Sequence, residues 1–414
     1  MRNTAADEKA FAGEMASGLK AAALRQKRRC GHKAVKKERV MERTSQKSQS
    51  GQKHIVLFIS ALRKGGAERV MVNLADYLHR NGVRVTLVTQ YICEEEYALP
   101  AGIPRILSEI TPQEETGSRS GDFLARYRKL RRIFRELAPD CILSFIGKNN
   151  IMTLLCTRFT GIPAVVSVRG EPKSEYYNFP MRFLAKTLFA CAAGVIVQTG
   201  AARDFFPPVI RKKAVILKNP LNPAFVRERR TERPDGRIVS VGRVDANKNH
   251  ALILRAFARI APEFPDASLV IYGDGEKRRE LIRKAQELGL SDRAQFPGAV
   301  SDVAEKIRTA SAFVLSSGHE GMPNALIEAM CLGIPSISTD CPCGGPRELI
   351  EDGVNGYLIP VGDEEALADR LRRIFSDEEG AERMGKQAAL LLEEYRPERV
   401  NAEWMDYLLG CAAR

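Results

Sequence analysis

The sequence predicts an α/β protein with two domains, each built on a parallel β-sheet that is wrapped by helices. Short apolar, β-branched runs alternate with helical patterns along most of the chain, and this alternation is typical of parallel sheets with helical crossovers. The alternation weakens once, at residues 218–235, where the chain is polar and contains several prolines. A length of 414 residues allows two domains that each bury a core. We therefore expect two α/β halves that face each other across a cleft.

The first half is expected to contain strands at 54–60, 83–90, 141–145, 164–168 and 194–198. Residues 67–80 follow the first strand with helical spacing. A second helical segment, 123–137, has apolar residues at positions 123, 127, 130, 134 and 137 on one face and six basic residues elsewhere. Such a helix normally covers its sheet, although a basic face of this kind also suits anionic lipid headgroups.

The second half repeats the pattern after the proline-containing segment. Strands are predicted at 236–242, 268–273, 312–316 and 335–338, each followed by a helix. Near the end, Trp404, Tyr407 and Leu408 recur at helical spacing, which predicts a C-terminal helix with an apolar face. The expected boundaries are 54–222 for the first domain, 223–395 for the second and 396–414 for the last helix.

The net charge of +13 is concentrated at the N-terminus. Residues 1–53 hold 14 Lys and Arg against 5 Asp and Glu, which leaves a net charge of only +4 on all the rest. A basic extension of low hydrophobicity is typical of disorder. It could also come from a start codon placed too far upstream, with Met41 as the alternative start. Because the charge lies in this extension and no zinc-finger, RNP or helix-turn-helix pattern is found, we expect no nucleic-acid partner.

Cysteine usage and hydrophobicity indicate a cytoplasmic protein. The nine cysteines are odd in number and scattered, several of them inside apolar runs, which is typical of reduced core cysteines. Cys341-Pro342-Cys343 has no second Cys pair or His partner nearby and is interpreted as loop structure. The chain has no apolar run of the ~18–20 residues that cross a bilayer, and no apolar core of a signal peptide at its start.

Two carboxylates, Glu320 and Glu328, stand eight positions apart around a Gly-Met-Pro-Asn turn and an apolar helical run. Pro323 suits the first position of a helix, whose free N–H groups and partial positive charge favour a phosphate. Glu320 then precedes the helix, and Glu328 lies about 1.5 turns beyond Pro323. A sugar joined through a diphosphate to a ribose has hydroxyls on both sides of its phosphates and fits this layout.

A second motif lies about eighty residues upstream. A buried-strand pattern ends at Gly242, and Arg243 and Lys248 follow in the next loop. The carboxyl ends of parallel strands are where open α/β sheets bind ligands. A guanidinium and an ammonium group together make a suitable clamp for a diphosphate.

These motifs together resemble the retaining glycosyltransferases of family 4, which have the GT-B fold: two Rossmann-like domains facing a cleft, with a C-terminal helix that returns to the first domain. The likeness covers most of the chain from about residue 54. The matching motifs are Glu320 to Glu328, Gly-Arg to Lys-Asn at 242–249, Lys-Gly-Gly-Ala-Glu-Arg at 64–69, Tyr-Gly-Asp-Gly at 272–275, Gly-Gly-Pro-Arg-Glu-Leu-Ile-Glu-Asp-Gly at 344–353 and Asn-Gly-Tyr-Leu at 355–358.

The resemblance implies a role for each motif. Arg243 and Lys248 would stabilise the departing diphosphate without a metal ion, and Glu320 would hold hydroxyls of the donor sugar. Family members retain the anomeric configuration, with the leaving phosphate taking the proton of the acceptor. We expect no cofactor and no metal. The expected donor-binding residues are Gly65, Gly66, Gly273, Gly275, Gly321, Met322, Asn324, Ala325 and, on the ribose, Glu328.

Two features depart from familiar patterns. The turn at 272–275 resembles the start of a dinucleotide fingerprint, but Arg278 stands where the third glycine belongs, which argues against a nicotinamide or flavin cofactor. Many relatives carry a His near the donor sugar where this chain has Arg169 and Glu171. These two side chains are expected to contact the acceptor or the sugar, or to pair with each other. Residues 296–302 follow a predicted strand and are candidates for contact with the base.

The sequence therefore predicts transfer of a hexose or N-acetylhexosamine from a nucleotide sugar, with UDP favoured, to a glycan or a polyprenyl-diphosphate-linked oligosaccharide. The basic helix at 123–137, together with Arg182 and Lys186, favours an acceptor at the inner, anionic membrane surface. A nucleotide-sugar epimerase of the same fold and a non-catalytic nucleotide-sugar-binding protein are the alternatives. A sugar phosphorylase is disfavoured because no lysine in a recognisable pyridoxal-phosphate setting is found.

Overall fold

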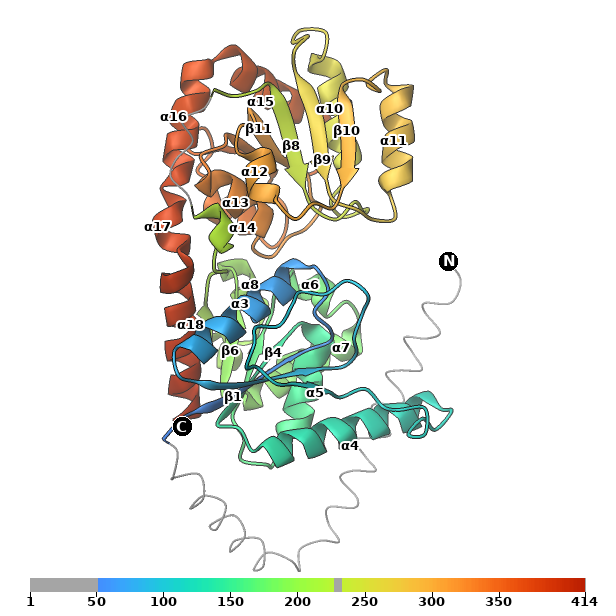
Figure 1. Cartoon of the computed structure of the whole chain (residues 1–414), viewed down its shortest axis with the longest axis vertical. Coiled ribbons are helices and arrows are strands. Elements are labelled where there is room, and N and C mark those ends of the chain that lie inside the picture. The colour runs from blue at the N-terminus through green and yellow to red at the C-terminus, as the bar shows by residue number, and fades with distance from the viewer. Residues whose placement is uncertain (1–50, 227–232, 414) are drawn as a thin grey trace, which may run out of the picture.

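The computed structural model describes residues 51–226 and 233–413. All but the last three residues of the predicted basic extension, 1–53, lie outside the described residues. Two α/β domains lie one above the other, and the C-terminal helices run along one side of both (Figure 1). The two-domain architecture expected from the strand–helix alternation is confirmed.

The first domain is built on a seven-stranded parallel sheet with the order β3-β2-β1-β4-β5-β6-β7. Its interior strand β1 is buried along its whole length, as expected for a parallel strand with helices on both faces. Its register places Ile55 opposite Val85 of β2 and Cys141 of β4. The strands are β1 (His54–Ile59), β2 (Arg84–Thr89), β3 (Arg105–Leu107), β4 (Cys141–Phe145), β5 (Ala164–Ser167), β6 (Gly194–Val197) and β7 (Ala214–Ile216).

The second domain repeats this topology with six parallel strands in the order β10-β9-β8-β11-β12-β13. In both sheets the order reverses beside the first strand of the domain, which creates a switch point where open α/β sheets bind ligands. These points lie between β1 and β4 and between β8 and β11. The strands are β8 (Arg237–Val241), β9 (Ser268–Tyr272), β10 (Ala294–Gly298), β11 (Ala312–Leu315), β12 (Ser336–Thr339) and β13 (Tyr357–Ile359).

Helices cover both faces of each sheet, as Figure 1 shows. Those of the first domain are α3 (Gly66–Arg80), α4 (Arg119–Leu137), α5 (Gly147–Thr157), α6 (Pro172–Glu175), α7 (Phe179–Leu188), α8 (Gly200–Asp204), α9 (Pro208–Arg211) and the 3-10 turn η1 (Phe189–Cys191). After the 3-10 turn η2 (Pro223–Phe225) come α10 (His250–Ile260), α11 (Arg278–Glu287), α12 (Val303–Ile307), α13 (Asn324–Cys331), α14 (Gly345–Leu349), α15 (Glu364–Ser376), α16 (Glu378–Ala389), α17 (Leu391–Tyr395) and α18 (Pro397–Ala412).

The returning helix α18 is part of the core of the first domain. Trp404 is fully buried and packs with Leu408 against β1, β4 and α3. Its indole N–H donates to the carbonyl of Lys218 at 2.9 Å, so the ring fixes the start of the interdomain linker. The predicted C-terminal helix and its return to the first domain are confirmed.

The structure differs from the expectations mainly at the edges of the sheets. The three-residue strands β3, β7 and β13 were not predicted, because so short a run carries no periodicity of its own. Residues 296–298 were expected to follow a strand but belong to β10, which contains an irregular register. Pro323 is the N-cap of α13, and the helix begins at Asn324, one residue later than expected. Within the described residues no helix is long and apolar enough to span a membrane.

Candidate active site

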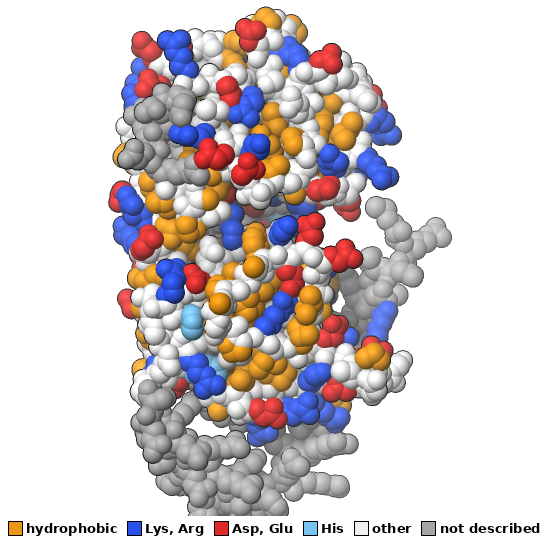
Figure 2. Space-filling view, in the orientation of Figure 1, with side chains coloured by type: hydrophobic (Ala, Val, Ile, Leu, Met, Phe, Trp, Pro, Cys, Tyr) orange, Lys and Arg blue, Asp and Glu red, His pale blue; other side chains and the backbone are white. Residues whose placement is uncertain are grey.

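Four loops meet between the domains because each leaves the carboxyl end of a parallel strand, three of them at the two switch points and the fourth one strand away. We call residues 60–65 after β1 the glycine loop, residues 242–249 after β8 the basic loop and residues 316–323 after β11 the acidic loop. A fourth segment, 168–171, follows β5. The surface is hollowed between the two domains, and acidic and basic side chains line this hollow (Figure 2).

Lys248 and Glu320 form an ion pair that joins the basic and acidic loops. The ammonium Nζ lies 2.6 Å from Glu320 Oε1, and the two side chains are 19% and 14% exposed. The Asn247 amide donates to the His319 carbonyl at 3.0 Å, and the His319 N–H donates to Asn247 Oδ1 at 3.0 Å. The lysine of the predicted diphosphate clamp and the predicted sugar carboxylate therefore lie side by side.

The side chain of Arg243 is far more exposed to solvent than that of Lys248. The Arg243 side chain is 78% exposed and lies 3.4 Å from Asp245, whose Oδ1 also accepts the Lys248 N–H at 2.9 Å. Glu68 of α3 lies across the hollow. Burial raises the pKa of the Glu68 carboxyl, and the positive charge of Arg243 lowers it. Arg243 is thus an exposed cation close to the first domain.

Gly273 and Gly275 pack closely against the backbone of the basic loop. A Cβ atom on Gly273 would collide with the carbonyl of Gly242, and one on Gly275 with the carbonyl of Val244. The Val244 N–H donates to the carbonyl of Asp274 at 2.9 Å, which holds the two turns together. The close backbone approach explains why glycine is required at both positions.

Glu328 faces the first domain rather than its own. Its carboxylate pairs with the guanidinium of Arg69 on α3, and the two side chains are 7% and 20% exposed. Burial raises the pKa of Glu328, and the adjacent Arg69 lowers it. The pair joins the two domains through side chains that are 259 positions apart in sequence.

A network of amide side chains connects the acidic loop to the first domain. Asn219, in the linker, donates to Asn324 Oδ1 and to the Met322 carbonyl, and the Met322 N–H donates to Gln198 Oε1 at 3.3 Å. The Asn324 amide also reaches the Gly66 carbonyl at 3.4 Å. A Cβ atom on Gly66 would lie 2.9 Å from the Asn324 amide nitrogen, so the glycine permits this approach.

Gly321 lies directly against the first domain. A Cβ atom there would lie 2.5 Å from the Arg169 carbonyl and 2.7 Å from Gln198 Oε1. On the other side, a Cβ atom on Gly345 would collide with the Gly321 carbonyl. The predicted donor-binding residues Gly321, Met322 and Asn324 therefore sit at a tight interdomain contact, and Ala325 packs against the core of the second domain.

Arg169 and Glu171, both among the described residues, have different partners and do not form an ion pair with each other. The Arg169 guanidinium donates to Asn219 and lies over the rings of Phe145 and Trp404, at 4.5 and 5.5 Å from their centroids. Burial lowers its pKa to about 9, so it stays charged at neutral pH. Glu171 instead accepts a hydrogen bond from Ser174 at 2.5 Å.

Glu175 is a buried acid that the sequence did not single out. Its Oε1 accepts the N–H groups of Arg169, at 2.7 Å, and of Gly170, at 2.5 Å. Its Oε2 is closed off from solvent and has no hydrogen-bond partner among the described residues. Burial raises its pKa to about 7. Glu175 thereby holds the loop against which Gly321 packs.

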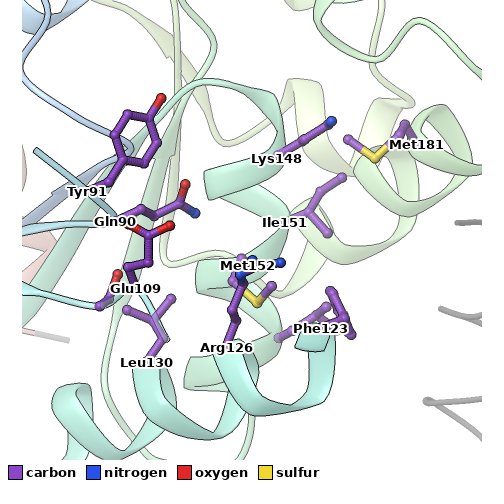
Figure 3. A pocket seen from close by; sticks show the side chains of 12 residues that line it. Gln90, Tyr91, Glu109, Phe123, Arg126, Leu130, Lys148, Ile151, Met152 and Met181 are labelled. Carbon is purple, nitrogen blue, oxygen red and sulfur yellow. The ribbon is translucent and has the colours of Figure 1, made fainter. Parts of the chain in front are cut away.

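A cavity of about 360 Å³ lies in the first domain, between α4 and α5. Figure 3 shows Gln90, Tyr91 and Glu109 on one side of it and the apolar side chains of Ile151 and Phe123 on the other. Its remaining lining residues are Ser108, Arg126, Leu130, Lys148, Met152, Leu155 and Met181. Gln90 and Lys148 follow β2 and β4, which flank β1, so the cavity begins near the glycine loop.

The described residues contain no group of three or more His, Cys, Asp or Glu side chains placed to hold a metal ion. Cys341 and Cys343 are free and buried, and the Cys343 carbonyl accepts the hydroxyl of Thr199 from the first domain at 3.0 Å.

Sequence reasoning did not select Arg69, Asn219 or Gln198, although all three touch the predicted site. Arg69 ends the Lys-Gly-Gly-Ala-Glu-Arg motif, so its position was a usable signal. Asn219 begins the Asn-Pro-Leu-Asn-Pro linker, where an amide next to a proline suggested only a turn. Gln198 ends a strand and gave no local signal.

Family comparisons divide the chain at the same place as its two sheets. Residues 64–225 match a family described as Glycosyltransferase Family 4, and residues 224–390 match one described as Glycosyl transferases group 1. One curated relative, from Campylobacter jejuni, is a GalNAc-α-(1→4)-GalNAc-α-(1→3)-diNAcBac-PP-undecaprenol α-1,4-N-acetyl-D-galactosaminyltransferase; it is 25% identical over 85% of this chain and 97% of its own. The amylovoran biosynthesis glycosyltransferase AmsD of Erwinia amylovora is 24% identical over 86% of this chain and 99% of its own.

Solved structures share the fold. HepE of Anabaena, in complex with UDP, superimposes with a TM-score of 0.72 at 19% identity, covering 87% of this chain and 100% of its own. Sucrose-phosphate synthase of Thermosynechococcus elongatus gives a TM-score of 0.75 at 17% identity, with 88% and 100% covered. The two-domain arrangement with a returning C-terminal helix is therefore the GT-B fold.

Proposed function

Because this chain belongs to the glycosyltransferases, with a family 4 first domain and a group 1 second domain, we propose that it is a retaining, metal-independent hexosyltransferase. It moves a hexose or N-acetylhexosamine from a nucleotide sugar, with UDP as the nucleotide, to a polyprenyl-diphosphate-linked oligosaccharide or a related glycan. The product serves the synthesis of a cell-surface polysaccharide such as a capsule or exopolysaccharide.

One observation carries the proposal: two carboxylates and two cations meet at the switch point of the second domain. Glu320 pairs with Lys248, Arg243 stands exposed beside them, and Glu328 lies on the helix that starts next to Glu320. The carboxylates provide acceptors for the hydroxyls of the donor sugar and of the ribose. The cations lie on the basic loop, where we place the diphosphate of a bound donor.

The reaction makes and breaks one bond at the anomeric carbon. The bond to the diphosphate oxygen breaks while the acceptor oxygen attacks from the same face, and the acceptor proton passes to the departing phosphate. The negative charge on the leaving group grows during this step. Lys248 exchanges Glu320 for the diphosphate, and Arg243 closes over it from its exposed position; stabilisation of developing charge is commonly worth about 10²- to 10³-fold in rate per donor group.

The cavity between α4 and α5 supports a place for the acceptor. Its lining is mostly apolar and also includes Arg126, Lys148 and Glu109. Its lining residues Gln90 and Tyr91 donate backbone N–H groups to the carbonyl of Ser60 in the glycine loop. A diphosphate attached to a prenyl chain combines the two chemistries that this lining offers. The relative from Campylobacter jejuni acts on an undecaprenyl-diphosphate-linked glycan, which agrees with an acceptor of this class.

The surface near this cavity supports a location at the inner face of the cytoplasmic membrane. Phe179 and Phe183 are stacked at 6.4 Å between ring centroids, and they are 79% and 58% exposed. The helix α4, which carries six basic residues between 123 and 137, lines the same cavity through Phe123, Arg126 and Leu130. Exposed aromatic rings beside a basic helix favour a peripheral protein that rests on anionic lipid.

A transfer assay tests the proposal. The full chain is incubated with a panel of nucleotide sugars and a short-chain prenyl-diphosphate-linked disaccharide, with and without EDTA. We expect a product one sugar longer, with the anomeric configuration of the donor by NMR and no loss of activity in EDTA. Inversion or dependence on a divalent metal would contradict the mechanism. Donor turnover without any acceptor would favour an epimerase, and donor binding without turnover a binding protein.

A further inference from the structure

We infer that Arg69 is a positioning residue of the donor site: it reaches across the cleft from the first domain, orients the carboxylate of Glu328 and holds it ready to accept hydrogen bonds from the ribose hydroxyls. This inference rests on the proposed function, because it concerns the carboxylate assigned to the ribose. It adds a residue of the first domain to a site whose charged groups otherwise belong to the second.

The contact itself is specific. Arg69 lies in the first turn and a half of α3, after the glycine pair, and its Nη2 donates to Glu328 Oε1. The Glu328 side chain is 7% exposed, and its carboxylate pairs with Arg69. A buried carboxylate of this kind needs a charged, hydrogen-bonding partner, because removal of one member of a buried pair leaves an uncompensated charge.

Arg69 supplies the positive charge that acts on Glu328 within the described part of the chain. The titratable groups that interact with this carboxyl are Arg69 on α3, Tyr97 in the loop after β2 and Cys331 on its own helix. Glu68, next to Arg69, is acidic and also buried in part. Tyr97 and Cys331 are neutral at physiological pH, since burial raises the pKa of each. Ionisation of Glu328 therefore depends on Arg69.

The position of the pair explains how it would act. α3 begins directly after the glycine loop, and α13 begins directly after the acidic loop. The Asn324 amide meets the Gly66 carbonyl three residues before Arg69, so the two helix starts are already in contact. Arg69 fixes the second turn of α13 against the start of α3, and this sets the direction in which the Glu328 carboxylate points.

The test is nucleotide binding measured by calorimetry between about pH 6 and 8.5, with UDP as the probe. The variants are Arg69→Gln, Arg69→Lys, Glu328→Gln and the double variant, and Arg80→Gln at the exposed far end of α3 is the control. The phosphate of UDP itself titrates in this range. Each curve of UDP affinity against pH is therefore compared with the curve for Glu328→Gln, which binds the same ligand but has no acid at position 328.

For Arg69→Gln we expect UDP affinity to fall about tenfold at pH 7, the scale of one hydrogen bond to a charged group. The affinity should then recover as pH rises, because Glu328 without Arg69 takes up a proton that UDP binding must release. Wild type and Arg80→Gln should show only the pH dependence of the ligand. Arg69→Lys should keep the wild-type pH profile, since it keeps the charge. The double variant should bind no more weakly than Glu328→Gln.

Three outcomes distinguish a failure of the proposed donor site from a failure of the role inferred for Arg69. If the wild type does not bind UDP, the proposed UDP donor site is wrong, and the role of Arg69 is wrong with it. If the wild type binds UDP and Arg69→Gln binds with the same affinity and pH profile, only the role of Arg69 is overturned. Equal losses from Arg69→Gln in the wild-type protein and in the Glu328→Gln variant would also overturn it, because Arg69 would then act independently of Glu328.

Discussion

The two domains present different chemical groups to the cleft between them. The face of the second domain presents charged side chains from two adjacent loops, with Lys248 on Glu320 and Arg243 exposed beside them. The face of the first domain includes backbone at Gly66 that meets Asn324, and Arg69, which contacts Glu328. Two further charged groups of the first domain, Arg169 and Glu175, are buried beneath the contact surface.

This difference suggests a division of labour. In the proposed function the second domain supplies Lys248 and Arg243 to the diphosphate, and both side chains are held by contacts within that domain. The first domain sets the position of those groups through close packing, and it carries the cavity proposed for the acceptor. Changes on the second face should therefore reduce catalysis, whereas changes on the first should alter stability, pH dependence or the acceptor.

The largest effect is expected at the second face. Arg243→Ala and Lys248→Ala should each lower kcat/KM for transfer by about 10²-fold or more, since each removes a cation from the departing diphosphate. The measurement is steady-state kinetics with the donor varied. Arg283→Ala, an exposed arginine on α11, is the control and should not change the rate. Unchanged kinetics for both Arg243→Ala and Lys248→Ala would remove the proposed clamp.

A methyl group at the contact between the faces tests the packing. Gly321→Ala should lower the free energy of unfolding by about 1–3 kcal/mol, because the new Cβ meets Arg169 and Gln198 of the first domain. Gly318→Ala, in the same loop, meets its nearest neighbour at 3.5 Å and should cost much less. Equal stability of the two variants in urea unfolding would show that the domains do not approach each other as closely as described.

The acceptor cavity of the first domain is tested by charge reversal. With a detergent-solubilised short-chain acceptor, Arg126→Glu should raise the KM for the acceptor about tenfold and leave the KM for the donor unchanged. Arg135→Glu lies on the same helix but does not line the cavity, and it is the matched control. Equal effects of the two changes would favour a diffuse basic surface over a defined acceptor cavity.

The smallest effect concerns pH. The pKa of Glu175 is raised to about 7 in the folded protein from an ordinary value of 4.5. Between these values the folded protein binds more protons than the unfolded chain, so this group makes the free energy of unfolding fall as pH rises. The stability of wild type relative to Glu175→Gln should therefore decrease from pH 4.5 to about 7 and level off above. A constant difference in chemical unfolding would mean that the carboxyl is not buried as described.

The sequence predicted the second face better than the first, for a physical reason. Glu320, Lys248 and Arg243 lie in loops that directly follow strongly apolar strands, so topology alone places them at one edge of the sheet. The pairing of Arg69 with Glu328 and the partners of Asn219 depend on how two domains pack, and no local pattern encodes this. Arg169 was expected near the acceptor or the sugar on position alone, and its side chain lies among Asn219, Phe145 and Trp404.

The central claim is a nucleotide-sugar donor site between Lys248, Glu320 and Glu328. It is tested most directly by thermal unfolding of the wild type and of Lys248→Ala with a panel of nucleoside diphosphates and nucleotide sugars, each with and without magnesium. A ligand at about 100 times its dissociation constant adds about 2.7 kcal/mol to the stability of the folded state. We expect one nucleotide family, the uridine compounds, to stabilise the wild type without magnesium, and a smaller shift in Lys248→Ala. No shift with any nucleotide, or equal shifts in both proteins, would contradict the account.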